Sequence, residues 1–149
     1  MPAIDIVRVD LLRKEIERAR ARLDRQHQGL HSSKKTERSL YGKLIEESTA
    51  VFVLLNEGRS LIPSAFAGDP KVQRLDRLIE QWRAFVEDPS GWRVQQQRRQ
   101  EAGLQTFTSY GYDVGSLDDL CSYARTEMHE SQHALREAAN AVLYARRGS

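Results

Sequence analysis

Apolar side chains recur along the chain at alternating intervals of three and four residues, in stretches separated by polar or glycine-rich segments. The first stretch runs from about Ile4 to His27, and charged residues fill most of the positions between its apolar ones. This spacing is typical of a helix that buries one narrow stripe. The apolar positions of the stripe are Val9, Leu12, Ile16, Ala19 and Leu23.

A second helical stripe follows a polar interruption that begins at Gly29 and continues through HSSKKTERS. The new stripe consists of Leu40, Leu44, Val51 and Leu55, and it broadens at the apolar run AVFVLL. Glycine and serine have low helix propensity, so we expect a break between two helices here. Residues 4–57 are therefore predicted to form a helical hairpin, long enough for a coiled-coil arm, with residues 58–69 as the following loop.

The next helix start is marked by Asp69 and Pro70, an N-cap acid followed by a proline at the first helical position. We expect helices over residues 70–102, interrupted at Asp88 to Gly91 and continued by a shorter, polar helix. Residues 103–115 mix aromatic residues with glycines and predict an ordered loop, or at most a short pair of strands.

Ser116 and Asp119 resemble a capping box and predict the start of a last helix over residues 116–147. At 1.5 Å per residue this helix would be about 45 Å long. Its stripe consists of Leu117, Leu120, Ala124, Met128, Ser131, Leu135, Ala138, Val142 and Ala145. The pattern as a whole predicts one all-α domain over residues 1–149, a helical bundle of four or five helices with an N-terminal hairpin and a long C-terminal helix.

Composition supports a single folded domain and excludes several classes of protein. The chain has 149 residues, of which 40% are hydrophobic and 30% are charged. Its formal charge is only +2, from 23 Lys and Arg against 21 Asp and Glu, which is weak support for nucleic-acid binding. We find no apolar run long enough to span a membrane and no secretion leader. Cys121 is the only cysteine in the sequence, so it has no second cysteine with which to form a disulfide. We therefore expect a cytoplasmic protein without membrane contact.

The segment HESQH, residues 129–133, fits the H-E-x-x-H pattern of zinc hydrolases. On a helix this spacing brings two imidazoles to one metal ion, while the glutamate polarises a water molecule. A zinc hydrolase also needs a third ligand, but Arg136 and Ala139 occupy the positions where the common continuation has glycine and histidine. We expect no catalytic residues, no cofactor and no small-molecule substrate.

The chain's 4 histidines form two pairs at i,i+4 spacing, His27 with His31 and His129 with His133. If the hairpin packs on the last helix, these side chains could meet in one interhelical metal site. The alternative is that they are solvated flank residues. His129 and His133 lie about 100° and 140° from the apolar stripe at 100° per residue, which favours the flank.

The HESQH helix resembles the last metal-binding helix of the DinB-like four-helix bundles over about ten residues. The resemblance implies a metal ion bound by the two histidines of this motif together with an earlier histidine. The second helical region, YGKLIEESTAVFVLL, contains no histidine. A metal-binding bundle is therefore an alternative hypothesis for this chain.

Basic residues are frequent in the first helix and at the tip of the hairpin. Such residues attract phosphate backbones, and the candidates for nucleic-acid contact are Lys34, Lys35, Arg38, Arg93, Arg98 and Arg99. Acidic residues alternate with the basic ones along the first helix, however, and this alternation is typical of the solvated flank of a coiled coil. Nucleic-acid backbone binding is the other alternative.

The narrow stripe of the first helix buries too little surface to be stable alone, so it needs a partner helix from its own chain or from another copy. We therefore expect a non-catalytic protein-interaction or assembly module, such as an adaptor, complex subunit or regulator, that self-associates or docks into a larger complex. The predicted contact residues are Val9, Leu12, Ile16, Ala19, Leu23, Arg18, Arg22 and Arg25.

Overall fold

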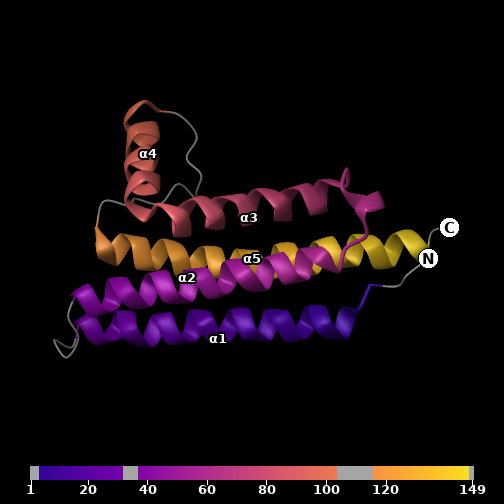
Figure 1. Cartoon of the computed structure of the whole chain (residues 1–149), viewed down its shortest axis with the longest axis horizontal. Coiled ribbons are helices and arrows are strands. Elements are labelled where there is room, and N and C mark those ends of the chain that lie inside the picture. Colours follow the sequence, from indigo (N-terminus) through magenta and orange to yellow (C-terminus); the bar gives the residue numbers. More distant parts are fainter. Residues whose placement is uncertain (1–3, 32–36, 104–115, 148–149) are drawn as a thin grey trace.

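The computed structural model describes residues 4–31, 37–103 and 116–147, and these residues are almost entirely helical. Four long helices lie side by side, and a shorter helix, α4, projects from one end of them (Figure 1). Their bounds are α1 Ile6–His31, α2 Glu37–Ser60, α3 Pro70–Glu87, α4 Pro89–Glu101 and α5 Leu117–Arg147. The described residues contain no strand, so the prediction of an all-α bundle is confirmed.

The four long helices form an up-down-up-down bundle (Figure 1). α1 packs against α2 and α5, and α3 packs against the same two helices from the other side. α2 and α5 also contact each other across the centre of the bundle. α1 and α3 therefore lie on opposite sides of a central pair. None of the described helices is long and apolar enough to cross a membrane.

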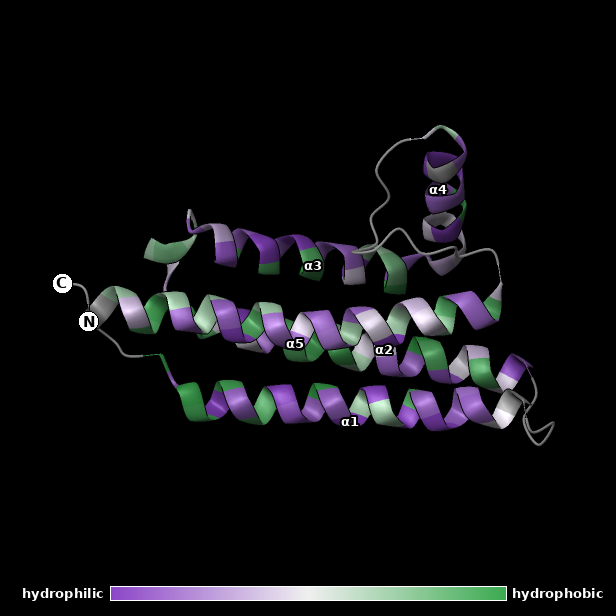
Figure 2. Cartoon of the chain, turned by 180° about the vertical axis from the view of Figure 1, so that it is seen from behind, coloured by the Kyte–Doolittle hydropathy of each residue, from purple (hydrophilic) through white to green (hydrophobic). Residues whose placement is uncertain are grey.

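The predicted stripe of α1 lies in the hydrophobic core. Its residues Val9, Leu12, Ile16, Ala19 and Leu23 are at most 1% exposed. α2 and α5 provide the surface that covers them, so the partner helices come from this chain. Figure 2 shows the same division along each long helix, where hydrophobic residues recur between hydrophilic ones. Because α1 packs on α5 as well as on α2, the hairpin is part of the bundle and does not protrude as a coiled-coil arm.

Local capping interactions fix two helix starts where the sequence predicts them. Asp69 Oδ1 accepts a hydrogen bond from the backbone N–H of Lys71 at 2.8 Å, with Pro70 at the first position of α3. Ser116 Oγ accepts a hydrogen bond from the backbone N–H of Asp119 at 3.0 Å and begins α5. Both predicted N-caps are confirmed.

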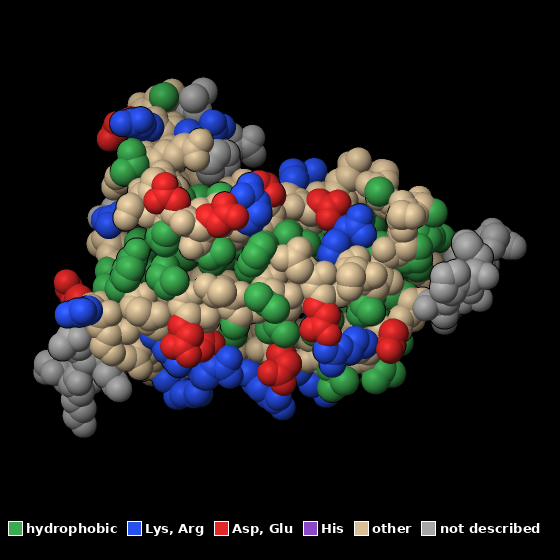
Figure 3. Space-filling view, in the orientation of Figure 1, with side chains coloured by type: hydrophobic (Ala, Val, Ile, Leu, Met, Phe, Trp, Pro, Cys, Tyr) green, Lys and Arg blue, Asp and Glu red, His purple; other side chains and the backbone are tan. Residues whose placement is uncertain are grey.

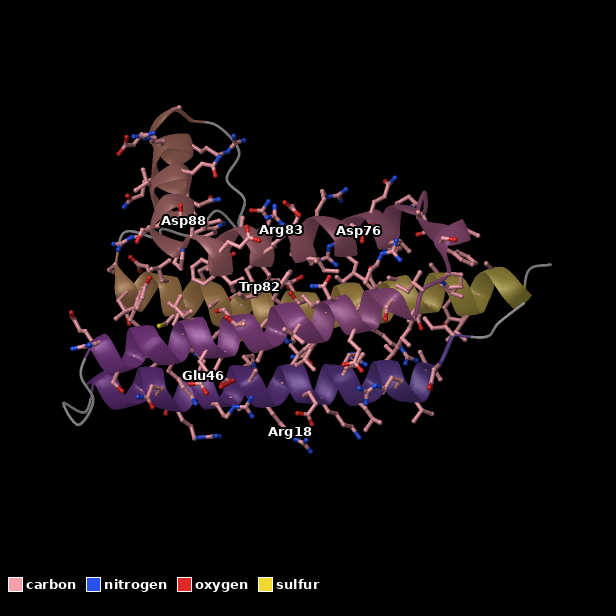
Figure 4. All side chains as sticks on the ribbon, viewed as in Figure 1. Arg18, Glu46, Asp76, Trp82, Arg83 and Asp88 are labelled. Carbon is pink, nitrogen blue, oxygen red and sulfur yellow. The ribbon has the colours of Figure 1, made fainter. Side chains whose placement is uncertain are left out.

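The predicted interruption between α3 and α4 is a corner at a single residue, Asp88. Its backbone N–H ends α3 by donating to the carbonyl of Ala84, and its Oδ1 accepts from the backbone N–H of Gly91 at 3.1 Å. One residue thus ends α3 with its backbone and caps α4 with its side chain, and α4 leaves the bundle directly after α3 (Figure 4).

Aromatic side chains anchor the first turn of α4 to the bundle. The ring centroid of Trp92 lies 4.8 Å from that of Tyr123 in α5 and 5.2 Å from that of Phe85 in α3. Trp82, which lies between α3 and α5 in Figure 4, completes the cluster and donates a hydrogen bond of 2.9 Å from Nε1 to Ser131 Oγ. Burial of these rings stabilises the junction of three helices.

Two predicted helix ends are wrong by a few residues. α1 continues through Gly29 to His31, α2 already begins at Glu37 within the predicted break, and residues 32–36 lie outside the described residues. α2 continues to Ser60, past the predicted loop start at residue 58, and the loop itself contains a short 3-10 helix, Ser64–Phe66. At Gly58, the close packing of α2 against α5 outweighs the low helix propensity of glycine.

Gly58 shows why a glycine can lie inside α2. A Cβ on this residue would lie 2.7 Å from Cδ1 of Leu135, so glycine allows α2 and α5 to approach closely. A second glycine, Gly103, follows the end of α4 with a φ of 69°, a conformation that favours glycine. The remainder of the predicted aromatic loop, residues 104–115, lies outside the described residues.

Candidate functional site

The two histidine pairs do not meet in one site. His27 is buried, and its Nε2 lies 2.6 Å from Oδ1 of Asp118 at the start of α5. His129 follows Asp118 by about three turns, which places it about 16 Å further along α5. The side chain of His31 is not among those described. His27 therefore has a structural contact between α1 and α5, at a distance from the HESQH motif.

The histidines of the HESQH motif are exposed on α5. The rings of His129 and His133 pack edge to face, with centroids 4.9 Å apart. Glu130, which would polarise a water molecule in a hydrolase, instead accepts a hydrogen bond of 2.9 Å from Arg74 of α3. Within the described residues, no group of three or more His, Cys, Asp or Glu is placed to hold a metal ion. The motif sits where the flank interpretation predicts.

The flank of α1 that faces α5 carries acidic residues at heptad spacing, and each contacts a side chain of α5. The pairs are Asp10 with Arg136, Glu17 with Gln132 and Asp24 with Arg125, at 2.9, 2.8 and 2.6 Å. The α5 partners follow in reverse order, as antiparallel helices require. Charges that flank a buried stripe select the partner helix in coiled coils. On this flank, α1 is therefore matched to α5 of its own chain.

These pairs border an open groove between α1 and α5. Its lining includes Glu17, Arg20, Arg125 and His129. The Arg20 guanidinium donates to Glu17 and holds the pKa of that carboxyl below its ordinary value. Arg125 is likewise bonded to Asp24. Because its guanidinium groups are neutralised by carboxylates of the chain, the groove offers little charge to select an anion.

The other flank of α1 is matched to α2. Arg22 donates to Glu47 at 3.0 Å, and Lys43 lies 3.4 Å from the same carboxylate. Glu47 is only 2% exposed, so these cations compensate a buried charge. The hydrogen bond to Glu47 in turn raises the pKa of Arg22 above its ordinary value. Arg22, a predicted partner contact, is therefore engaged within the bundle.

The side of α1 that faces away from the bundle carries a second row of residues at three- and four-residue intervals. The members of this outer row are Val7, Leu11, Lys14, Arg18, Ala21 and Arg25. Val7 is 67% exposed and Leu11 is 47% exposed. Figure 3 shows Lys and Arg side chains along the lower edge of the molecule, over α1, with hydrophobic side chains at one end.

The basic members of the outer row are accessible. Lys14, Arg18 and Arg25 are all exposed, and Figure 4 shows Arg18 pointing away from the bundle. Arg18 forms an ion pair with Glu15 one turn before it on the same helix. In the part of the chain that the structure describes, no carboxylate pairs with Lys14 or Arg25. Of the three arginines in the predicted partner contact, Arg18 and Arg25 therefore remain on the surface.

The predicted stripe contacts have a different position. Val9, Leu12, Ile16, Ala19 and Leu23 are inaccessible in the folded bundle. Their contact with a separate partner stays a prediction that would require α1 to leave α2 and α5. The exposed residues Val7 and Leu11 were not among the predicted contacts, although their spacing is visible in the sequence. The inner stripe has the same period and is more apolar, so the sequence pattern indicates the inner stripe as the contact surface.

The basic residues considered for nucleic-acid contact do not form one surface. Arg38 is exposed at the start of α2, while Arg93, Arg98 and Arg99 belong to α4, which lies across the bundle from α1 (Figure 1). Lys34 and Lys35 lie outside the described residues. The basic side chains of α1 and those of α4 would therefore face different ligands.

A band of hydrophobic side chains also follows the edge between α2 and α3 (Figure 3). Arg59 and Asp76 form an ion pair of 2.7 Å between these helices, while Ile45, Phe52, Ile79 and Val86 are partly buried and pack against the core. Their packing stabilises the contact of α2 with α3. Val7 and Leu11 have no such packing role, so the outer row of α1 is the better candidate for a binding surface.

Comparison of the chain with protein-family models, with curated proteins and with solved structures finds no match. The resemblance of the HESQH helix to the DinB-like bundles therefore stays limited to that short segment. The function has to be inferred from the side chains of this chain.

Proposed function

We propose that this protein is a non-catalytic interaction module, and that the outer row of α1 binds another protein. The observation that carries the proposal is the exposure of two large apolar side chains one turn apart, Val7 at 67% and Leu11 at 47%. Apolar side chains surrounded by charged ones are typical of protein interfaces, where the apolar part is desolvated and the polar rim stays wet.

The position of the outer row suits such a module. The inner stripe of α1 holds the bundle together, and the outer row lies on the opposite side of the same helix. A partner can therefore cover Val7 and Leu11 without disturbing the core. This arrangement supports an adaptor, a complex subunit or a regulator, and it does not require the bundle to open.

Nucleic-acid backbone binding has less support. Arg18 and Arg22 form ion pairs with carboxylates of the chain, which compete with phosphate for their charge. The arginines of α4 lie on the other side of the bundle (Figure 1). Phosphate contacts would also leave the apolar side chains of the outer row uncovered.

Site-specific photo-crosslinking in the cells that produce the protein tests the proposal. A photoreactive phenylalanine replaces Leu11 in one variant and Val94 in the control, because Val94 is 44% exposed on the distant α4. We expect a discrete protein adduct from position 11 only. Excess parent protein without the photoreactive group should compete for the partner and reduce the yield of the adduct. The double variant Val7→Ser, Leu11→Ser should not reduce it. A nuclease-sensitive adduct, or equal labelling at both positions, would overturn the proposal.

A further inference from the structure

The charges of α1 are unequally satisfied within the chain. The cations that pair with carboxylates are Arg8 with Glu57, Arg13 with Asp10, Arg18 with Glu15, Arg20 with Glu17 and Arg22 with Glu47. Among the described residues, Lys14 and Arg25 have no such partner. Both belong to the outer row, and they lie about 16 Å apart along the helix. The outer row therefore has uncompensated positive charge at both ends of its basic part.

The apolar and basic members of the outer row are also separated along the helix. Val7 and Leu11 occupy the first two positions, and Lys14, Arg18 and Arg25 follow them. A ligand that binds along the whole row must cover the apolar surface of Val7 and Leu11 at one end. It must also supply negative charge to the basic residues along the remaining turns. The row is thus polarised, and its spacing is that of a helix that packs on another helix.

We infer that the partner of the outer row is an acidic amphipathic helix of another protein. Apolar side chains of that helix cover Val7 and Leu11, and its carboxylates meet Lys14, Arg18 and Arg25. Three carboxylates on the partner at successive intervals of about four and seven residues match the positions of these cations. The inference rests on the proposed function and specifies the chemistry of the partner.

A second copy of the chain does not fit the same row. Parallel pairing of two outer rows would place arginines opposite the same arginines. Antiparallel pairing about the middle of the row would place Lys14 opposite Arg18 and Val7 opposite Arg25. Each arrangement brings like charges together or leaves a charge against an apolar side chain, and like charges at an interface oppose association.

Nucleic acid matches only part of the row. Phosphates could neutralise Lys14 and Arg25, but they would leave Val7 and Leu11 in contact with water. Even when Arg18 is counted with them, three neutralised phosphates predict a slope of only about 3 for the logarithm of the binding constant against the logarithm of the salt concentration, which is typical of weak binding. The apolar end of the row therefore favours an acidic helix, which can cover Val7 and Leu11, over nucleic acid, which cannot.

Designed helical peptides of about 20 residues test the inference, since that length can form a stable helix. The acidic peptide carries Leu at the positions that face Val7 and Leu11, and Glu at the positions that face Lys14, Arg18 and Arg25. The control peptide has Lys in place of each Glu. Both are made in forward and reversed order, because the row does not fix the direction of the partner. Binding is measured by fluorescence anisotropy at low and physiological salt.

We expect the acidic peptide to bind the parent protein and the Lys peptide not to bind. In the variant Lys14→Glu, Arg25→Glu the preference should reverse, which a purely structural effect of the substitutions would not produce. The double variant Val7→Ser, Leu11→Ser should bind the acidic peptide at least about tenfold more weakly. Arg77→Glu is the matched control, since Arg77 is an exposed cation on α3, and it should leave binding unchanged.

Three results with the purified protein would overturn the inference. The first is equal binding of both peptides, or no binding of the acidic peptide in either order. The second is a single-stranded oligonucleotide that binds through Lys14 and Arg25 regardless of substitutions at Val7 and Leu11. The third is a dimer of the parent protein, detected by sedimentation, that Leu11→Ser dissociates. If the adduct at position 11 persists in the Lys14→Glu, Arg25→Glu variant, the proposed function stands and only the acidic partner is excluded.

Discussion

Gly58 of α2 lies directly against the side chain of Leu135 of α5, so that a Cβ on the glycine would be 2.7 Å from Cδ1 and 3.0 Å from Cδ2 of the leucine. Leu135 is fully buried and is enclosed by the core. The close approach of the two central helices therefore depends on the absence of a side chain at residue 58.

We expect Gly58→Ala to destabilise the protein by about 1–3 kcal/mol, because the added methyl group overpacks the core and outweighs the gain in helix propensity. Gly42→Ala is the matched control, since a Cβ at residue 42 of the same helix meets nothing within 4 Å. The control should stabilise the protein by up to about 1 kcal/mol. Urea unfolding followed by circular dichroism measures both. Equal effects of the two substitutions would show that α2 and α5 are not closely packed here.

The hydrogen bond between Trp82 and Ser131 provides a second prediction. Ser131→Ala leaves the indole N–H of Trp82 buried without its acceptor, and we expect a loss of about 1–3 kcal/mol in the free energy of unfolding. Ser48→Ala is the control, because Ser48 is equally buried in α2 and its hydroxyl has no hydrogen-bond partner in the described structure. Its effect should stay within about 0.5 kcal/mol. A similar cost for both serines would contradict the assigned hydrogen bond.

Cys121 should be unreactive in the folded protein. Burial raises the pKa of its thiol to about 12, so at pH 8 only about one thiol in ten thousand is ionised, and the thiolate is the reactive form. Because the folded pKa lies above the ordinary value, the stability that this thiol contributes is complete below about pH 9 and is lost as the pH rises towards about 12.

Alkylation at pH 8 checks this prediction. The parent protein should react at the rate of its unfolding, and it should react much faster in denaturant. Cys121→Ala combined with Ser122→Cys moves the thiol by one residue into the groove between α1 and α5, and this variant should react in the folded state. Rapid alkylation of the parent would show that Cys121 is accessible.

Much of this fold is local and could be predicted from the sequence. The stripe around Leu12 and the N-caps Asp69 and Ser116 depend on residues within one or two turns, and each is found where the sequence places it. The burial of Gly58 and the contact of His27 with Asp118 depend on residues far apart in the sequence, so local patterns do not contain them. The packing of α1 against α2 and α5 likewise depends on contacts between residues far apart in the sequence.

The candidate site was only partly predictable for a related reason. Leu11 and Leu12 are adjacent leucines in the same helix, and each belongs to a row with intervals of three and four residues. The sequence shows both rows, but only the arrangement of α2 and α5 shows that one is covered by this chain and the other is not. The exposure of Val7 and Leu11 is therefore information that the fold adds.

These adjacent leucines test the central claim, that α1 folds with one side and binds with the other. Leu12 is 1% exposed and Leu11 is 47% exposed. Leu12→Ser should lower the free energy of unfolding by about 2–5 kcal/mol, whereas Leu11→Ser should change it by less than about 0.5 kcal/mol. The deciding measurement is the affinity of folded Leu11→Ser for the acidic peptide relative to the parent. We predict a loss of about tenfold with unchanged stability; an affinity equal to that of the parent would contradict the claim.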